Sequence, residues 1–251
     1  LLPHVASSLA PAGVSEVEVD LEVKTPVTLA RVELDALAPG KVDARAPPPP
    51  MIGMPAPATR DDGYLLGASP RYQFARLDVV MALRDAFART RARFRRDPIA
   101  LYDVSQWNGV RPASDVGKPR HISHAGGRDA DIALPAADDE PSTMRHHCDG
   151  VLEDGGRSYR CLPGTARGLD AERLAFLLGR LAKGGRVQAI FLDREFFPAV
   201  AAAADALVAK RWLDAKTAAL LGDGGLLHHA GWHTDHVHVR FTGRLAPKRF
   251  E

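Results

Sequence analysis

The chain has 251 residues, and its 45% hydrophobic and 25% charged residues are ordinary shares for a globular protein. Its 33 basic and 31 acidic residues give a formal net charge of +2, so the composition does not indicate a nucleic-acid partner. We expect no transmembrane segment, because no apolar run approaches the roughly 20 residues needed to cross a bilayer.

The first 55 residues differ in pattern from the rest. Hydrophobic and acidic residues alternate over residues 16–23, which is typical of a half-buried strand, and a weaker alternation follows over residues 27–34. Four prolines at 47–50 must be extended and cannot join the interior of a sheet. We therefore expect residues 1–55 to form an N-terminal β-type extension with a Pro-rich spacer, and residues 56–251 to form the main domain.

Hydrophobic periodicity predicts the elements of the main domain. A helix is predicted over residues 76–94 and a short strand over 99–104, whereas the polar stretch 134–168 is predicted to be a surface loop insertion. The later patterns predict helices at 169–183, 196–212 and 214–221 and strands at 187–192 and 236–241. Because no βαβ unit repeats, we expect an α+β fold with an antiparallel sheet and flanking helices.

Two cysteines, Cys148 and Cys161, lie in the polar insertion. They fit a disulfide in an exported protein, and two free thiols are the alternative. The neighbouring His146 and His147 lack the spacing for a four-ligand metal site with these cysteines.

Two clusters of histidine and aspartate carry the strongest functional signal. The first cluster contains His121, Ser123, His124, Arg128, Asp129 and Asp131, and the second contains His233, Asp235, His236 and His238. Histidine nitrogens and carboxylate oxygens are common ligands of zinc, and a catalytic zinc site has three protein ligands and an open position. A purely structural site would more often contain cysteines, and neither cysteine is in the clusters.

The spacing within each cluster suits one metal site. His236 and His238 are two apart on a predicted strand and point to the same face, so one can bind metal while the other faces its water. Two glycines between His124 and Asp131 allow a sharp bend, so both side chains can reach one ion. Zinc polarises a substrate carbonyl and lowers the pKa of water to about 7, and a nearby histidine or carboxylate then accepts the proton.

The motifs Ser-His124-x-x-Gly-x-Asp-x-Asp131-Ile and His233-x-x-His236-x-His238-Val-Arg resemble those of the penicillin-insensitive murein endopeptidases. This family belongs to the group of lysostaphin-type, D-Ala-D-Ala and murein metallopeptidases. The resemblance covers residues 101–132, including an Asp-Val-Ser segment at 103–105, and residues 232–241. It is thin between these ranges and absent from residues 1–60.

The resemblance implies a zinc cleft with one Zn²⁺ per chain, bound by His124, Asp131 and His238. It implies that His236 lies beside the water as base or transition-state stabiliser, and that His233 is a second active-site histidine. The implied reaction is cleavage of D-alanyl–meso-diaminopimelyl amide bonds in peptidoglycan cross-links, without a serine nucleophile. The implied location is the periplasm or outside the cell.

Three alternatives concern the activity. Related peptidoglycan carboxypeptidases have an acidic general base at the position of Asp235, whereas strand alternation favours His236 as the base. The activity could also be that of a D-Ala-D-Ala carboxypeptidase or dipeptidase of the same fold. A catalytically inactive cell-wall-binding relative is a third possibility, although no ligand residue has been lost.

The remaining cluster residues are expected to support the ligands or to face the substrate. His121 and Ser123 are expected in this role, and Asp129 is expected to orient a ligand histidine or the local turn. Arg128 and Arg240 could hold a substrate carboxylate, although a structural ion pair is the more typical role for each.

Overall fold

The computed structural model describes residues 51–112, 121–138, 141–153, 155–156 and 158–242. It also describes the backbone of two short strands, β1 (Glu18–Val19) and β2 (Leu29–Arg31), which pair antiparallel. The rest of the predicted extension, with its Pro-rich run, lies outside the described residues. The division into an extension and a main domain stays a prediction.

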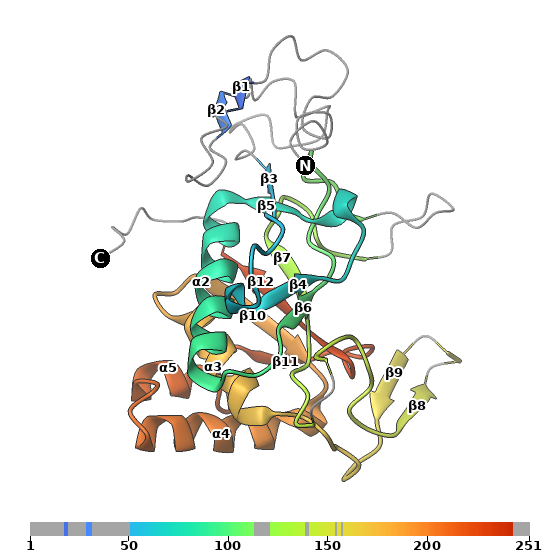
Figure 1. Cartoon of the computed structure of the whole chain (residues 1–251). Helices are drawn as coiled ribbons and strands as arrows, with labels where there is room; N and C mark the ends of the chain where they lie inside the picture. Colours follow the sequence, from blue (N-terminus) through green and yellow to red (C-terminus); the bar gives the residue numbers. More distant parts are fainter. Residues whose placement is uncertain are drawn as a thin grey trace.

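A six-stranded sheet forms the centre of the main body (Figure 1). In spatial order its strands are β11 (Leu227–His229), β10 (Val187–Leu192), β12 (His236–Phe241), β7 (Asp129–Ala133), β6 (Ile99–Leu101) and β4 (Tyr64–Leu66). The α+β class is confirmed, but the sheet is mixed instead of antiparallel, because both edge pairs, β11–β10 and β4–β6, are parallel.

Helical connections account for the two parallel strand pairs at the edges of the sheet. Parallel neighbours need a crossover connection, and α2 (Leu77–Phe94) lies in the connection from β4 to β6. The helices α4 (Phe197–Ala209) and α5 (Ala215–Ala219) lie in the connection from β10 to β11. These helices and α3 (Ala171–Ala182) confirm the predicted helical segments, and β10 and β12 have the predicted bounds.

The two central strands separate a hydrophobic face from a polar face. On β12, Val237 and Val239 are fully buried in the core that includes α2, α3 and α4. On β7, Ile132 is fully buried in the same core. Because successive side chains of a strand point to opposite faces, His238 on β12 and Asp131 on β7 lie on the other face. Strand alternation thus puts Asp129 and Asp131 of the first cluster and His236 and His238 of the second on one face.

The polar insertion is more ordered than predicted. It contains a hairpin of β8 (Gly150–Glu153) and β9 (Ser158–Cys161), which lies at the lower right of Figure 1. Cys148 and Cys161 form a disulfide that closes the base of this hairpin. The hairpin has half-buried strands with few large apolar residues, so its periodicity is weak in the sequence.

Short elements complete the main body. The strands β3 (Met51–Gly53) and β5 (Phe74–Arg76) pair antiparallel, and three 3₁₀ turns occur at Arg60–Asp62 (η2), Pro70–Tyr72 (η3) and Arg194–Phe196 (η4). β3 lies within the segment predicted as extension, yet it pairs with the main body. Within the described ranges, no helix combines the length and apolar character needed to cross a membrane.

Candidate metal centre

The register of β7 and β12 places two predicted ligands side by side. His238 is the direct cross-strand partner of Asp131, and its Nδ1 lies 3.0 Å from Oδ1 of Asp131. His124 enters from the loop before β7, with its Nε2 3.1 Å from Nδ1 of His238 and 3.2 Å from Oδ1 of Asp131. All three side chains are buried.

The spacing of these three atoms fits a zinc ion. Zinc bonds of about 2.0–2.1 Å in a tetrahedron place ligand atoms about 3.3 Å apart, close to the separations between these atoms. Two imidazole nitrogens and one carboxylate oxygen are also a normal donor set for a hydrolytic zinc site. The sequence-predicted ligands therefore converge, although their role as ligands stays a prediction.

Hydrogen bonds orient both imidazoles. Nδ1 of His124 lies 2.7 Å from the carbonyl oxygen of Val104, so it donates there and leaves the lone pair of Nε2 facing the cluster. Nε2 of His238 lies 2.9 Å from Oδ1 of Asp129, which leaves Nδ1 on the cluster side. Carboxylates and carbonyls behind metal-binding histidines commonly set the tautomer in this way.

Asp129 makes further contacts that hold the site. Its Oδ2 accepts a hydrogen bond from the backbone N–H of His124 (3.2 Å), and its Oδ1 pairs with Nε of Arg240 (2.7 Å). Arg240 therefore forms the structural ion pair that was expected. Through one buried carboxylate, Asp129 joins His124 in the loop to His238 and Arg240 on β12.

The loop between the ligands bends at two glycines. Gly126 and Gly127 both have positive φ angles (73° and 61°), and His124 has a φ of 67°, which is uncommon for a residue with a side chain. A Cβ on Gly127 would lie 2.4 Å from Sδ of Met51 and 2.8 Å from the backbone nitrogen of Arg76. The predicted bend is confirmed, and Gly127 packs closely against Met51 of β3 and Arg76 of β5.

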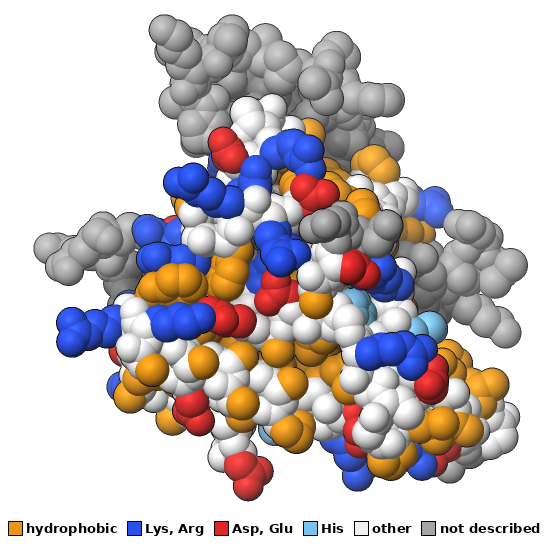
Figure 2. Space-filling view, turned by 60° about the horizontal axis from the view of Figure 1, so that its bottom comes forward, with side chains coloured by type: hydrophobic (Ala, Val, Ile, Leu, Met, Phe, Trp, Pro, Cys, Tyr) orange, Lys and Arg blue, Asp and Glu red, His pale blue; other side chains and the backbone are white. Residues whose placement is uncertain are grey.

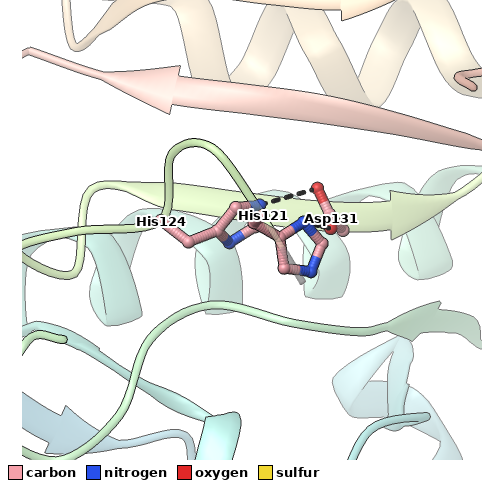
Figure 3. A group of neighbouring side chains, drawn as sticks. All are labelled: His121, His124 and Asp131. Atoms are coloured by element: carbon pink, nitrogen blue, oxygen red, sulfur yellow. Dashed lines mark ion pairs between the residues drawn. The ribbon is translucent and has the colours of Figure 1, made fainter. Parts of the chain in front are cut away.

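His121 forms a second group that overlaps the first. Ligand atoms of His121, His124 and Asp131 all lie within 4.8 Å of one another (Figure 3). Nδ1 of His121 is 3.8 Å from Oδ2 of Asp131, and its Nε2 is 2.8 Å from Oδ2 of Asp103. Both groups share His124 and Asp131, and the group with His238 is the tighter of the two. His121 and His238 are thus two candidates for the third ligand beside His124 and Asp131.

The predicted catalytic residues lie beside this group. Nε2 of His236 is 3.9 Å from Oδ1 of Asp131, while its Nδ1 is 2.6 Å from Oδ1 of Asp235. Asp235 precedes β12, so strand alternation does not set the direction of its side chain, and its carboxylate contacts the imidazole of His236. The ring centroid of His233 is 4.6 Å from that of His236.

Burial and charge shift the pKa values within the cluster. Burial alone would raise the pKa of Asp131, but the adjacent His124 and His236 hold it well below its ordinary range. Burial opposes protonation of His238, yet hydrogen bonds to Asp129 and Asp131 raise its pKa to about 9. Burial and the charge of His236 lower the pKa of His233 to about 4, so His233 is neutral at pH 7.

Other predicted residues lie in the same region without a defined role. Ser123 and Arg128 are half-buried, and the backbone carbonyl of Arg128 accepts a hydrogen bond from Phe241. Asp103 belongs to the family-like Asp-Val-Ser segment, which by itself does not predict a role for its carboxylate. Its contact with His121 was missed because it joins residues on opposite sides of a long loop.

A cavity of about 370 Å³ lies between β9 and η4. Its lining includes the ion-paired Glu153 and Arg160 together with Asp193, Arg194 and Glu195, and it contains no histidine. We place the candidate function in the histidine cluster, because only there do metal-binding atoms converge within the described part of the chain.

The chain matches no protein-family model and no curated protein. The likeness to murein endopeptidases therefore rests on the motif residues.

Proposed function

We propose that this chain is a zinc-dependent peptidoglycan hydrolase that cleaves peptide cross-links at D-alanyl–meso-diaminopimelyl amide bonds. The observation that carries the proposal is the convergence of His124, Asp131 and His238, whose three ligand atoms lie 3.0–3.2 Å apart. The reaction class is inferred from this donor set, and the substrate class from the motif resemblance.

His124, Asp131 and His238 would hold the metal ion. When bound, zinc supplies a Lewis acid for the scissile carbonyl and acidifies a water molecule. Val104 and Asp129 keep the two imidazoles in the orientation that directs a lone pair at the ion. The buried ligands exclude bulk water, which strengthens electrostatic interactions at the reacting bond.

His236 is the proton acceptor in this proposal. Its Nδ1 hydrogen-bonds to Asp235, so its Nε2 faces the cluster and can take a proton from water and return it to the leaving amine. Asp235 orients the ring and stabilises its positive charge. Burial by itself would raise the pKa of Asp235, but the hydrogen bond from His236 keeps it below its ordinary value. Asp235 thus remains an anion at neutral pH.

His121 and His233 have supporting roles. The side chain of His121 is 25% exposed, compared with 0% for His124 and 6% for His238, which supports a substrate-facing role for His121 in this proposal. Asp103 orients it through Nε2. His233 is neutral and can donate or accept a hydrogen bond beside His236.

We place the protein in the periplasm or outside the cell. The disulfide between Cys148 and Cys161 supports this, because disulfides persist in oxidising compartments and are rare in the cytosol.

The first experiment incubates purified cross-linked muropeptide dimers with the protein, with and without a zinc chelator, and follows the products by mass spectrometry. We expect conversion of dimers to monomers that the chelator abolishes and added zinc restores. Loss of terminal D-alanine alone would move the assignment to a carboxypeptidase. An unchanged dimer with zinc-loaded protein would contradict hydrolysis and favour a binding protein.

Zinc content of variants tests the ligand set. His238→Ala should lose both zinc and activity, whereas His121→Ala should retain zinc. His229→Ala, on the exposed edge strand β11, is the control for removing a histidine elsewhere. If His121→Ala lost zinc and His238→Ala retained it, the group of His121, His124 and Asp131 would be the metal site instead.

A further inference from the structure

An aromatic pair joins the polar insertion to the histidine cluster. The rings of Tyr159 on β9 and Trp232 before β12 are stacked, with centroids 5.7 Å apart and 26° between their planes. The backbone N–H of Trp232 also donates to the carbonyl of Tyr159 (2.7 Å). Trp232 is 48% exposed, so this pair, which we call the aromatic platform, reaches the surface.

The backbone holds Trp232 in an unusual conformation. Its φ angle is 64°, in the left-handed region that favours glycine over a large side chain. The preceding Gly231 is packed so closely that a Cβ there would lie 2.1 Å from Oγ of Ser158. Strain of this kind is commonly retained where a side chain must keep a defined position for function. The positive φ of Trp232 and the close packing of Gly231 together fix where the Trp232 ring lies.

The platform lies next to the proposed reaction site. Trp232 is followed directly by His233, whose ring is 4.6 Å from His236 and 6.0 Å from His238. On the other side, Tyr159 contacts the exposed His146, with ring centroids 4.8 Å apart. Figure 2 shows hydrophobic side chains gathered at the lower right, over the part of the molecule that carries β8 and β9.

The platform combines an apolar face with polar edges. Nδ1 of His146 is 2.6 Å from Oγ1 of the buried Thr234, so the imidazole is held at the edge of the aromatic pair. The Tyr159 hydroxyl adds a donor and acceptor. A pyranose ring has complementary properties, because its C–H groups form an apolar face and its hydroxyl and amide groups a polar rim. An aliphatic peptide side chain would use only the apolar face.

We propose that the aromatic platform of Tyr159 and Trp232 binds a sugar ring of the glycan strand and so positions the attached peptide at the metal centre. This inference rests on the proposed function, since it assumes a substrate in which peptides are attached to amino sugars. An extended peptide spans about 3.3–3.6 Å per residue, so a stem of a few residues reaches from the platform to the cluster. The platform makes the enzyme selective for glycan-linked peptides.

The first test measures sugar binding without any reaction. The protein is labelled at the indole nitrogens of its three tryptophans and titrated with chitotetraose, a peptide-free oligomer of N-acetylglucosamine, by NMR. We expect a saturable shift of the Trp232 signal, with the Trp107 and Trp212 signals as internal references. No shift, or a shift only with a glycan-free stem tetrapeptide, would overturn the sugar assignment.

Trp232→Gly is the decisive variant. Glycine suits the positive φ angle, which offsets the stacking lost with the ring, so the variant should stay folded while losing the platform. We expect its affinity for chitotetraose to fall at least tenfold. Met81→Ala, on the exposed side of α2, is the control and should bind normally. Wild-type affinity in Trp232→Gly would overturn the proposal.

A turnover assay separates this inference from the proposed function. The ratio of kcat/KM for glycan-linked dimers to that for glycan-free dimers should fall at least tenfold in Trp232→Gly, mainly through KM. An unchanged ratio in an active enzyme would overturn the platform and leave the proposed reaction intact. Sugar binding at Trp232 in a protein that cleaves no muropeptide would support the platform and contradict the reaction.

Discussion

His238 and Asp131 face each other directly across β12 and β7, with Nδ1 of the imidazole 3.0 Å from Oδ1 of the carboxylate. Side chains at opposed positions of antiparallel strands lie on the same face with Cβ atoms about 4.5–5.5 Å apart. The sheet therefore fixes the spacing between these two donors before any metal binds, and only His124 is placed by a loop. A centre of this kind needs little rearrangement to accept an ion.

Asp129→Asn should weaken zinc binding about 10–100-fold while the protein stays folded, because the amide cannot replace the charge behind His238 or the ion pair with Arg240. A competition titration with a chromogenic chelator measures this affinity. Glu172→Gln removes an acid from an exposed pair with Lys210 and serves as the control. Equal affinities in Asp129→Asn and the wild type would show that this carboxylate does not tune the site.

His236→Ala should lower kcat about 10²–10⁴-fold and retain zinc, since the proton acceptor is lost and the ligands are intact. Asp235→Asn should reduce kcat less, because Asp235 acts on the reaction through the ring of His236. Steady-state kinetics on a cross-linked dimer, with zinc content measured in parallel, give both values. A larger loss in Asp235→Asn would make Asp235 the base.

Gly127→Ala should destabilise the protein more than Gly126→Ala. Both positions have positive φ, which costs a residue with a side chain about 1–2 kcal/mol. Only Gly127 also has neighbours within 3 Å of a Cβ, in Met51 and Arg76, which adds about 1–3 kcal/mol. Urea unfolding measures the free energy of unfolding of the two variants. Equal losses of this free energy would mean that the packing of residue 127 against β3 and β5 can relax.

Replacing both Cys148 and Cys161 by serine should lower the free energy of unfolding by about 3 kcal/mol, the value expected for a loop of this length. Urea unfolding with and without dithiothreitol tests this. The reductant should destabilise the wild type by a similar amount and leave the double variant unaffected. A loss below about 1 kcal/mol would mean that the unfolded chain gains little freedom when the loop opens.

Acidification should lower the free energy of unfolding through protonation of the buried His147, which lies just before the hairpin. Burial, aided by the charge of Arg145, lowers the pKa of His147 below its ordinary value of 6.5. The unfolded chain therefore binds this proton more readily, so the stability is present above pH 6.5 and falls as the pH drops towards the folded pKa. His147→Gln should lose less unfolding free energy than the wild type between about pH 7.5 and pH 5.5. An identical pH dependence would exclude His147 as the titrating group.

The sequence determined the elements that depend on local patterns and on residue chemistry. The helical spacing of apolar residues located α2 and α3, a short apolar run located β10, and the alternation of polar and apolar residues located β12. Residue type and spacing marked the two histidine–aspartate clusters as metal-binding candidates, and the motif resemblance singled out His124, Asp131 and His238 among them.

Only the tertiary structure decided how distant segments meet. The mixed sheet, the placement of Asp131 on a strand opposite His238, and the contact of Asp103 with His121 all join residues far apart in the chain. The pairing of the strands, and which nitrogen of each imidazole faces the cluster, depend on hydrogen bonds to distant partners. Such bonds leave no periodic signal in the segments they join, so local sequence identifies the donors and the folded sheet sets their geometry.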